Sequence, residues 1–330
     1  MNVMELPLRY EMVLNPTQPF NFTGTFHKPS HFPASVNCFK DNSFWVTVRR
    51  GKSVYGINLR PSGRRKAGID MRVFASRPIS QKDLDALTAE VRYRFGMDLN
   101  LSQFRDIAEA DPLLRPIEKR WRGMRPSCAF SLYELLCITI VLQNAQVSRS
   151  VKMLQAMLDR FGKRVQFDGV YLFAFWPSSA VANADEAELR ELKVGYRAKS
   201  FLSVSQFFSE HPGFEDEVRL LSKVDAARRL REIYGVGPAT AWYLLFESLK
   251  HVDAFDHVSP WEQKIISRVV FNQEIVSAER ILSEARERWG AWRMLAIHYI
   301  FEDLFWRRHH EHIDWLDALI RIRPGANDPI

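Results

Sequence analysis

The sequence has few cysteines, and they form no recognisable framework. Only Cys38, Cys128 and Cys137 occur, at wide spacing and without a CxxC pair. An odd, dispersed set of this kind excludes a disulfide ladder and is typical of a reducing compartment. The sequence therefore predicts a cytoplasmic protein.

Long apolar runs and a signal peptide are also missing. The most apolar stretch, SLYELLCITIVLQ at 131–143, falls short of the ~20 residues that span a bilayer. The first fifteen residues carry charges and no apolar core run. We therefore expect no membrane partner, and we find neither an internal repeat nor a low-complexity tract.

The composition is that of a folded, basic protein. Of 330 residues, 46% are hydrophobic and 12% aromatic, enough for one large domain or two to three smaller ones. The formal net charge of +7 fits a polyanionic partner, although an ordinary basic soluble protein would explain it equally well.

The first third of the chain has the alternation of β-strands. FNFTGTF at 20–26 places Phe and Gly on one face, and turn residues separate three further predicted strands at 43–50, 53–60 and 69–75. Residues 79–95 have helical spacing, with Ser80 and Asp83 as a capping pair, and should cover one face of an antiparallel sheet. The sequence predicts a β-rich domain at 1–98.

From about Asn100 the helical pattern dominates. Two helices flank a polar break at 143–146, and a strong helix start, Ser259-Pro260 with Glu262, opens another. Further helices are predicted at 185–192, 197–211, 225–234 and 291–309. The predicted fold class is α+β, with a helical domain at 99–330.

Gly235-Val236-Gly237, followed by Pro238, interrupts the helical pattern at about 227–246. A phosphate loop would need GxxxxGK[ST], and a dinucleotide site would need a third glycine after a strand; both are missing. A tight turn between two helices remains, in which both glycines can take positive φ. Its outward N–H groups would suit a DNA phosphate, whereas the alternative is an ordinary hairpin in a core.

The segment LREIYGVGPATAWYLLF at 230–246, followed by VDAF, resembles the helix-hairpin-helix (HhH-GPD) DNA glycosylase superfamily. Three more segments resemble its 8-oxoguanine and alkyladenine branches: LQNAQVSRSVKML, LKVGYRAKSFLSV and AWRMLAIHYIF. The resemblance implies a TATA-binding-protein-like antiparallel β-domain followed by a large all-α domain. It also implies that the protein flips a damaged or modified base out of double-stranded DNA and cuts its glycosidic bond.

By this resemblance, each motif has a role. The hairpin, with Gly235, Val236, Gly237 and Ala239, would anchor a phosphate and hold a monovalent cation. The duplex wedge and the contact to the estranged base would come from Gln143, Asn144, Ala145, Gln146 and Arg149. The base pocket would contain Trp242, Tyr243, Phe301 and His257. The alternatives are a solvated turn for the wedge and plain core packing for the aromatics.

The resemblance also implies the chemistry. Ala239 occupies the position of the family's lyase lysine, so we expect a monofunctional enzyme, and no cysteine after Cys137 could hold an iron–sulfur cluster. The window of the family's catalytic aspartate holds Ser259 and no carboxylate. Asp256 is the preferred substitute, with Asp253, Glu262 and Ser259 as alternatives. A silent fold that only recognises DNA is the second hypothesis.

The tail segment RRHHEHIDW offers a weaker signal. On a helix, His309 and His312 would share one face, and His310 and Asp314 another. No second cluster completes a metal site, so we expect no metal and a basic surface near DNA. We further expect a monomer associated with the nucleoid.

Overall fold

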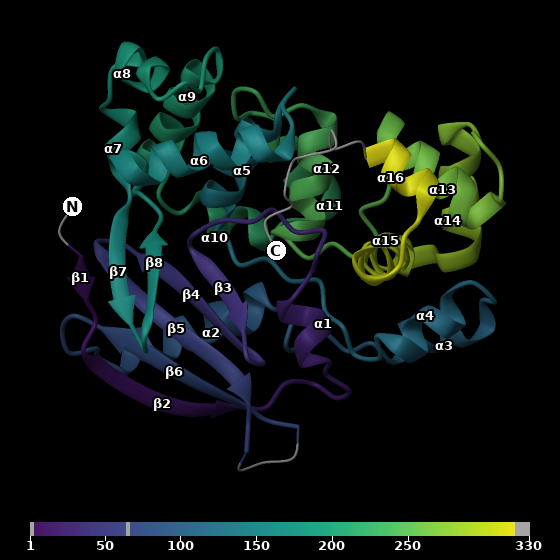
Figure 1. Ribbon diagram of the computed structural model, residues 1–330, viewed down its shortest axis with the longest axis horizontal. Coiled ribbons are helices and arrows are strands. Elements are labelled where there is room, and N and C mark those ends of the chain that lie inside the picture. The colour runs from purple at the N-terminus through teal and green to yellow at the C-terminus, as the bar shows by residue number, and fades with distance from the viewer. Residues whose placement is uncertain (1–2, 64–66, 321–330) are drawn as a thin grey trace.

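The computed structural model describes residues 3–63 and 67–320, and its architecture is α+β (Figure 1). A five-stranded antiparallel sheet has the order β2-β6-β5-β4-β3, and a three-stranded sheet has the order β1-β7-β8. The strands are β1 Met4–Glu5, β2 Leu8–Leu14, β3 Asn37–Lys40, β4 Ser43–Arg50, β5 Ser53–Pro61, β6 Ile69–Ala75, β7 Lys163–Phe167 and β8 Val170–Ala174. The three strands predicted at 43–75 are confirmed, whereas β2 gave no signal that we recognised.

Helix α2 (Gln81–Arg94) covers one face of the five-stranded sheet, as predicted. Leu87 and Val91 lie one turn apart and are buried with sheet residues such as Ile57. The helix begins where the Ser80 side chain accepts a hydrogen bond from the Asp83 N–H, which confirms the predicted cap.

The predicted strand at 20–26 is wrong, because this segment contains helix α1 (Phe22–Phe26). The Asn21 side chain accepts from the Gly24 N–H and caps the helix. Phenylalanines at every second position also place an i,i+4 pair on one helical face, and the rings of Phe22 and Phe26 lie 4.6 Å apart. The pattern was therefore ambiguous, and the cap decided it.

The all-α prediction for the second segment is also wrong, because β7 and β8 form a hairpin within it. Strand β7 pairs in parallel with β1, and Thr47 of β4 donates from its hydroxyl to the Phe173 carbonyl of β8. The hairpin lies so close to β5 that a Cβ on Gly56 would sit 2.5 Å from the Phe167 ring. Part of the helical segment thus extends the β-rich layer. The boundary at residue 98 and the TATA-binding-protein-like topology stay predictions.

The remaining helices surround two apolar cores. They are α3 Ser102–Ala110, α4 Leu114–Arg120, α5 Leu132–Leu142, α6 Val147–Phe161, α7 Ser178–Ala182, α8 Glu186–Glu191, α9 Arg197–Glu210, α10 Phe214–Arg219, α11 Lys223–Leu230, α12 Pro238–Glu247, α13 Pro260–Phe271, α14 Ala278–Trp289, the 3₁₀ turn Gly290–Trp292, α15 Arg293–His310 and α16 Asp314–Ile320. One core is built on α5, α6 and α9, and the other on α3, α4, α14 and α15.

Helix α12 joins the two cores. Its Leu244 and Leu245 are buried in the first core, and its Phe246 is buried in the second. The residues that α12 turns to neither core therefore face the junction between the two halves of the helical region. Within the described part of the chain, no helix is long and apolar enough to cross a membrane.

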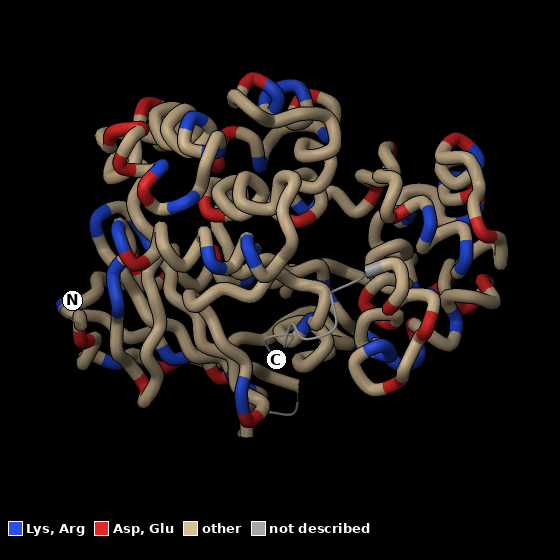
Figure 2. The backbone as a smooth tube through the Cα atoms, turned by 45° about the horizontal axis from the view of Figure 1, so that its top comes forward, with Lys and Arg blue, Asp and Glu red and all other residues tan. Residues whose placement is uncertain are grey.

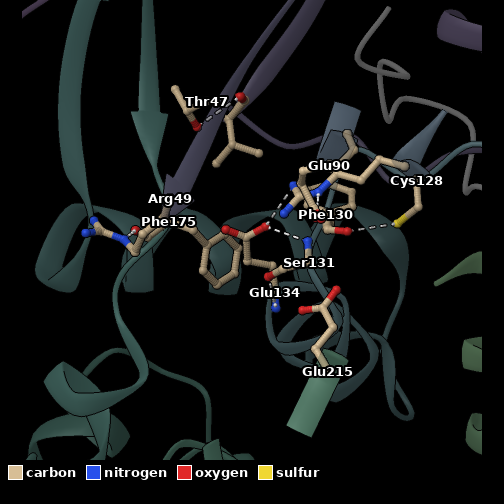
Figure 3. Close-up of polar contacts among 12 residues, drawn as sticks. Thr47, Arg49, Glu90, Cys128, Phe130, Ser131, Glu134, Phe175 and Glu215 are labelled. Carbon is tan, nitrogen blue, oxygen red and sulfur yellow. Dashed lines mark hydrogen bonds and ion pairs between the residues drawn. The ribbon is translucent and has the colours of Figure 1, made fainter. Parts of the chain in front are cut away.

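A buried ion-pair network ties the sheet-covering helix to the helical region. Glu90 of α2 pairs with Arg94 at 2.6 Å and with Arg219 of α10 at 2.7 Å, and Arg219 also pairs with Glu215 at 2.5 Å. Arg94 lies 3.9 Å from Glu134, which closes the capping box with Ser131 at the start of α5 (Figure 3). We call Glu90, Arg94, Glu215 and Arg219 the paired network.

Candidate functional site

The glycine turn joins α11 to α12, as the sequence predicts, but only one of its glycines needs positive φ. Gly235 has φ +83°, whereas Gly237 is extended, with φ −83° and ψ 177°, and acts as the N-cap of α12. Gly237 does not use the positive φ open to it, because an N-cap residue takes a β-region backbone. A Cβ on Gly237 would meet no atom within 4 Å, so this side of the turn is open.

The open side presents free backbone donors. The Val236 N–H bonds to the Ile233 carbonyl, and the Ala241 N–H bonds to the Gly237 carbonyl. Over residues 3–63 and 67–320, the N–H groups of Gly235, Gly237 and Ala239 find no acceptor. Unpaired N–H groups at a helix N-terminus form a site for an anion such as phosphate.

The predicted wedge is the loop between α5 and α6, and the LKVGYRAKSFLSV segment braces it. The Arg197 guanidinium donates to the carbonyls of Ile140 (3.1 Å) and Gln143. The Asn144 amide donates to the Tyr196 hydroxyl at 3.3 Å, and that hydroxyl reaches the Gln143 carbonyl at 3.4 Å. The resemblance had given this segment no role; the structure assigns it the support of the loop.

Exposure differs among the predicted wedge residues. Asn144, at φ +48°, is exposed together with Gln146 and Arg149, whereas Ala145 packs against the first core. The same helix that braces the loop also reaches the hairpin, because Ser200 of α9 lies 3.7 Å from a Cβ on Gly235. Helix α9 therefore contacts the loop between α5 and α6 and also lies beside the glycine turn.

The four predicted pocket residues do not share one environment. Trp242 packs into the first core and has the Lys223 ammonium 5.8 Å from its ring. Phe301 packs between the rings of Trp261 (5.9 Å) and Phe305 (6.4 Å), and His257 is exposed. The structure thus places Trp242 toward α11 and Phe301 toward the start of α13.

Tyr243 is a partly exposed side chain beside ionisable groups. Its surface is 41% exposed, yet burial by the surrounding protein raises the pKa of its phenol well above the ordinary value. Glu247 and Glu302 contribute to the raised pKa of Tyr243, so this ring lies near their carboxyl groups.

Asp256 is the centre of an ion-pair cluster. Its carboxylate lies 2.9 Å from Lys223, 3.0 Å from Arg293 and 3.5 Å from Arg286. Burial alone would raise the pKa of Asp256, but the hydrogen bond from Lys223 and the charge of Arg293 lower it. Lys223 also binds Asp253 at 2.7 Å. These contacts link α11 to α14 and α15 and partly neutralise both carboxylates.

Ser259 and Glu262 are engaged with each other, as predicted for a helix start. The Ser259 hydroxyl accepts from the Glu262 N–H, and the Glu262 carboxylate accepts from the Ser259 N–H at 2.8 Å. All four candidates for the catalytic position therefore have local structural partners.

The histidine-rich tail does not form the expected shared faces. Helix α15 ends at His310, so His312 lies beyond it and contacts Asp314 at 2.9 Å and Asp317 at 2.8 Å. The pairing predicted for His309 with His312 is wrong because Glu311 leaves the helical conformation. Among the described residues, no group of histidine, cysteine and carboxylate side chains could hold a metal ion.

Sequence reasoning missed a polar cluster beside Tyr243. The members of this polar cluster are Lys28, His31, Glu247, Lys250, His298 and Glu302. The i,i+4 spacing of Tyr243 with Glu247, and of His298 with Glu302, was a readable signal that each pair shares a helical face. No local signal connected Lys28 and His31 to those helices.

Positive charge is distributed over both halves of the molecule. Figure 2 shows Lys and Arg interspersed with Asp and Glu along the whole chain. The net charge of +7 is therefore not concentrated in one basic segment.

Comparison with known proteins points to DNA glycosylases. No protein-family profile matches the chain. A DNA-3-methyladenine glycosylase of Bacillus subtilis is 23% identical over 233 residues, which cover 70% of this chain and 76% of the relative.

Two solved structures share the fold over nearly the whole chain. A 3-methyladenine DNA glycosylase from Archaeoglobus fulgidus gives a TM-score of 0.70 at 19% identity, covering 90% of this chain and 99% of that protein. An 8-oxoguanine glycosylase/lyase of Clostridium acetobutylicum, in complex with double-stranded DNA, gives 0.66 at 18% identity over 93% and 99%. The resemblance to these two glycosylase branches, and the α+β fold, are confirmed.

Proposed function

We propose that this chain, which has the fold of the DNA glycosylases it resembles, is a monofunctional DNA N-glycosylase. It would bind double-stranded DNA containing a damaged or modified base, flip that base out of the stack and hydrolyse its N-glycosidic bond. The observation that carries this proposal is the contact of α9 with the wedge loop and its position beside the glycine turn.

The proposed sequence of contacts follows from this arrangement. The free N–H groups of the turn bind a backbone phosphate, with a monovalent cation at the same turn. Asn144 and Gln146 enter the duplex, and Arg149 contacts the partner of the extruded base. Tyr243, which is 41% exposed, stacks on the flipped base, because an aromatic face favours a planar ring.

A monofunctional reaction fits the absence of a lysine from the hairpin. Ala239 offers no amine for a Schiff base, so water is the proposed nucleophile at C1′ and an abasic site the proposed product. Asp256 remains our proposed source of the negative charge that stabilises the cationic sugar. Its three cationic partners reduce that charge, so variants must separate a catalytic role from a structural one.

A second candidate function is a catalytically silent recognition module. The observation in its favour is that Asp253, Asp256 and Glu262 all have local partners. In either case we propose a monomer that acts on nucleoid DNA in the cytoplasm and requires no iron–sulfur cluster.

The test is an abasic-site assay on duplexes that carry single oxidised, alkylated, deaminated or hypermodified bases. Alkali-dependent cleavage by the wild type, lost in Tyr243→Ala, would establish the monofunctional glycosylase. Loss in Asp256→Asn at unchanged melting temperature would assign the carboxylate. Salt-sensitive DNA binding without cleavage of any duplex would favour the silent module.

A further inference from the structure

The faces of α12 and α15 that meet at the junction carry polar groups at matching helical spacing. Tyr243 and Glu247 are one turn apart on α12, and His298 and Glu302 are one turn apart on α15. The rings of Phe246 and His298 lie 5.0 Å apart, so the two faces touch. The segment after α1 then lies against this junction with Lys28 and His31.

Two buried polar atoms in this cluster have no hydrogen-bond partner. Glu302 is only 4% exposed; its Oε1 accepts from the Ser30 hydroxyl at 2.5 Å, but its buried Oε2 has no hydrogen-bond partner. The buried Nε2 of His31 is also without a partner and lies 3.8 Å from the Glu302 Oε1. Buried polar atoms are rarely left unpaired, so this pair points to a ligand.

The protonation of both groups suits hydrogen bonding and not ion pairing. Burial raises the pKa of Glu302 to about 7, although Lys28 opposes the shift. Burial, together with Lys28 and Lys250, lowers the pKa of His31 well below its ordinary value. A neutral imidazole and a carboxyl group that exchanges its proton near neutrality can each donate or accept.

Lys28 and Lys250 determine which further ligand groups the cluster favours. The Lys28 ammonium uses two of its three donors, on the Arg125 carbonyl at 2.7 Å and on His298 Nε2 at 2.9 Å. The Lys250 ammonium donates to the Glu247 carbonyl at 2.7 Å. Two ammonium groups in this cluster disfavour a ligand that itself carries positive charge.

We propose, on the basis of the proposed glycosylase function, that His31 and Glu302 form the specificity-determining contact to the flipped base. The ligand is an uncharged base whose edge carries an oxygen substituent, oxo or hydroxyl, and a neighbouring N–H or O–H. Glu302 and His31 bind that edge, the free donor of Lys28 faces the oxygen, and Tyr243 stacks on the ring. Bases made cationic by N-alkylation are excluded.

The experiment compares four lesions in one duplex sequence: 8-oxoguanine, 5-hydroxyuracil, 5-hydroxymethylcytosine and 7-methylguanine. Single-turnover kcat/KM is measured for the wild type, Glu302→Gln, His31→Phe and the matched surface variant Glu287→Gln. We expect cleavage of at least one oxygen-bearing base and a loss of about ten- to a hundredfold in Glu302→Gln, the size of one hydrogen bond to a charged group. His31→Phe should lose a similar factor, and Glu287→Gln should match the wild type.

Outcomes against the inference are distinct from failure of the proposed function. Preferred cleavage of 7-methylguanine, or an unchanged lesion preference in both variants, would overturn it. If the wild type cleaves no duplex, the proposed function fails and equilibrium binding tests the inference. The proposed contact is supported only if an oxygen-bearing lesion binds more tightly than the parent base and Glu302→Gln abolishes the difference. Any other binding result would overturn it. If Glu302→Gln does not fold, His31→Phe gives the same comparison.

Discussion

Two groups of buried charges in this molecule differ in how completely they are paired. In the paired network, Glu90 has two arginine partners, and Arg219 binds two carboxylates. In the polar cluster, the Glu302 Oε2 and the His31 Nε2 have no partner. Both oxygens of Glu90 bind arginines, although the buried Nε of Arg219 has no hydrogen-bond partner, whereas the Oε2 of Glu302 binds nothing. The network stabilises an interface, and the Glu302 carboxyl retains unused hydrogen-bonding capacity.

The pKa values express the same contrast. Burial alone would raise the pKa of Glu90, but Arg94 and Arg219 lower it to about 2. Deeper burial raises the pKa of Glu302 to about 7, and Lys28, which donates to His298 and to a backbone carbonyl, opposes the shift only in part. The Glu90 carboxylate, whose two oxygens both bind arginines, has a structural role. The Glu302 carboxyl has one oxygen without a partner, so it is available to a ligand.

The largest expected effect is on the paired network. Glu90→Ala leaves Arg94 and Arg219 without their carboxylate and should lower the free energy of unfolding by about 3–5 kcal/mol. Urea unfolding at pH 7 measures the change, with the exposed Glu287→Ala as the control. A loss smaller than about 1 kcal/mol would show that the network is no stronger than surface pairs.

The next effect concerns the pH dependence of stability at Glu302. Its pKa is raised on folding, so between about pH 4.5 and 7 the unfolded chain releases this proton while the native state keeps it. Stability from this group therefore falls as pH rises through that window, by up to about 3 kcal/mol. Glu302→Gln should flatten this fall. Lys28 and Glu247 are the charged neighbours that modulate it, and His31 and His298 are the titratable groups that face it.

Unfolding curves at intervals from pH 4.5 to 8 test that prediction. Glu90 gives the opposite sign, because its stabilisation is complete above its unfolded pKa and is lost as pH falls toward 2. If the free energy of unfolding changed with pH in the same way for the wild type and Glu302→Gln, Glu302 would not keep its proton in the native state, and the prediction would be wrong.

A smaller effect is expected at Arg197, a buried charge whose partners are backbone carbonyls. Arg197→Ala removes the contacts to Ile140 and Gln143 and should destabilise the protein by about 1–3 kcal/mol. It should weaken DNA binding more than the exposed control Arg190→Ala, because the wedge loop loses its brace. Thermal unfolding and fluorescence anisotropy measure the two effects, and equal DNA affinity in both variants would refute the bracing role.

The smallest stability effect should come from Gly237→Ala. A Cβ there meets nothing and φ is negative, so the cost should stay below about 1 kcal/mol. DNA affinity should fall, because the methyl group would occupy the space in front of the free N–H groups. Gly213→Ala, another open N-cap position, is the matched control, and an unchanged affinity in Gly237→Ala would argue against a phosphate at this turn.

Local features were readable from the sequence. The Ser80 and Ser259 caps, the helix pair around the 143–146 break and the α11–α12 hairpin all rest on contacts within a few residues. Hydrophobic spacing and capping chemistry act over one or two helical turns, so the sequence by itself determined these elements and their order.

The rest was decided by tertiary structure. Residues 22–26 form a helix because the Asn21 cap decided between two periodicities that the sequence allowed. Strand β7 pairs with β1, which lies near the N-terminus of the chain. The contact of Ser30 with Glu302 joins positions 272 residues apart. No local pattern encodes such a contact, because burial and pairing depend on which side chains the packed helices bring together. The sequence thus named the motifs, but only the fold brought His31 and Glu302 together beside Tyr243.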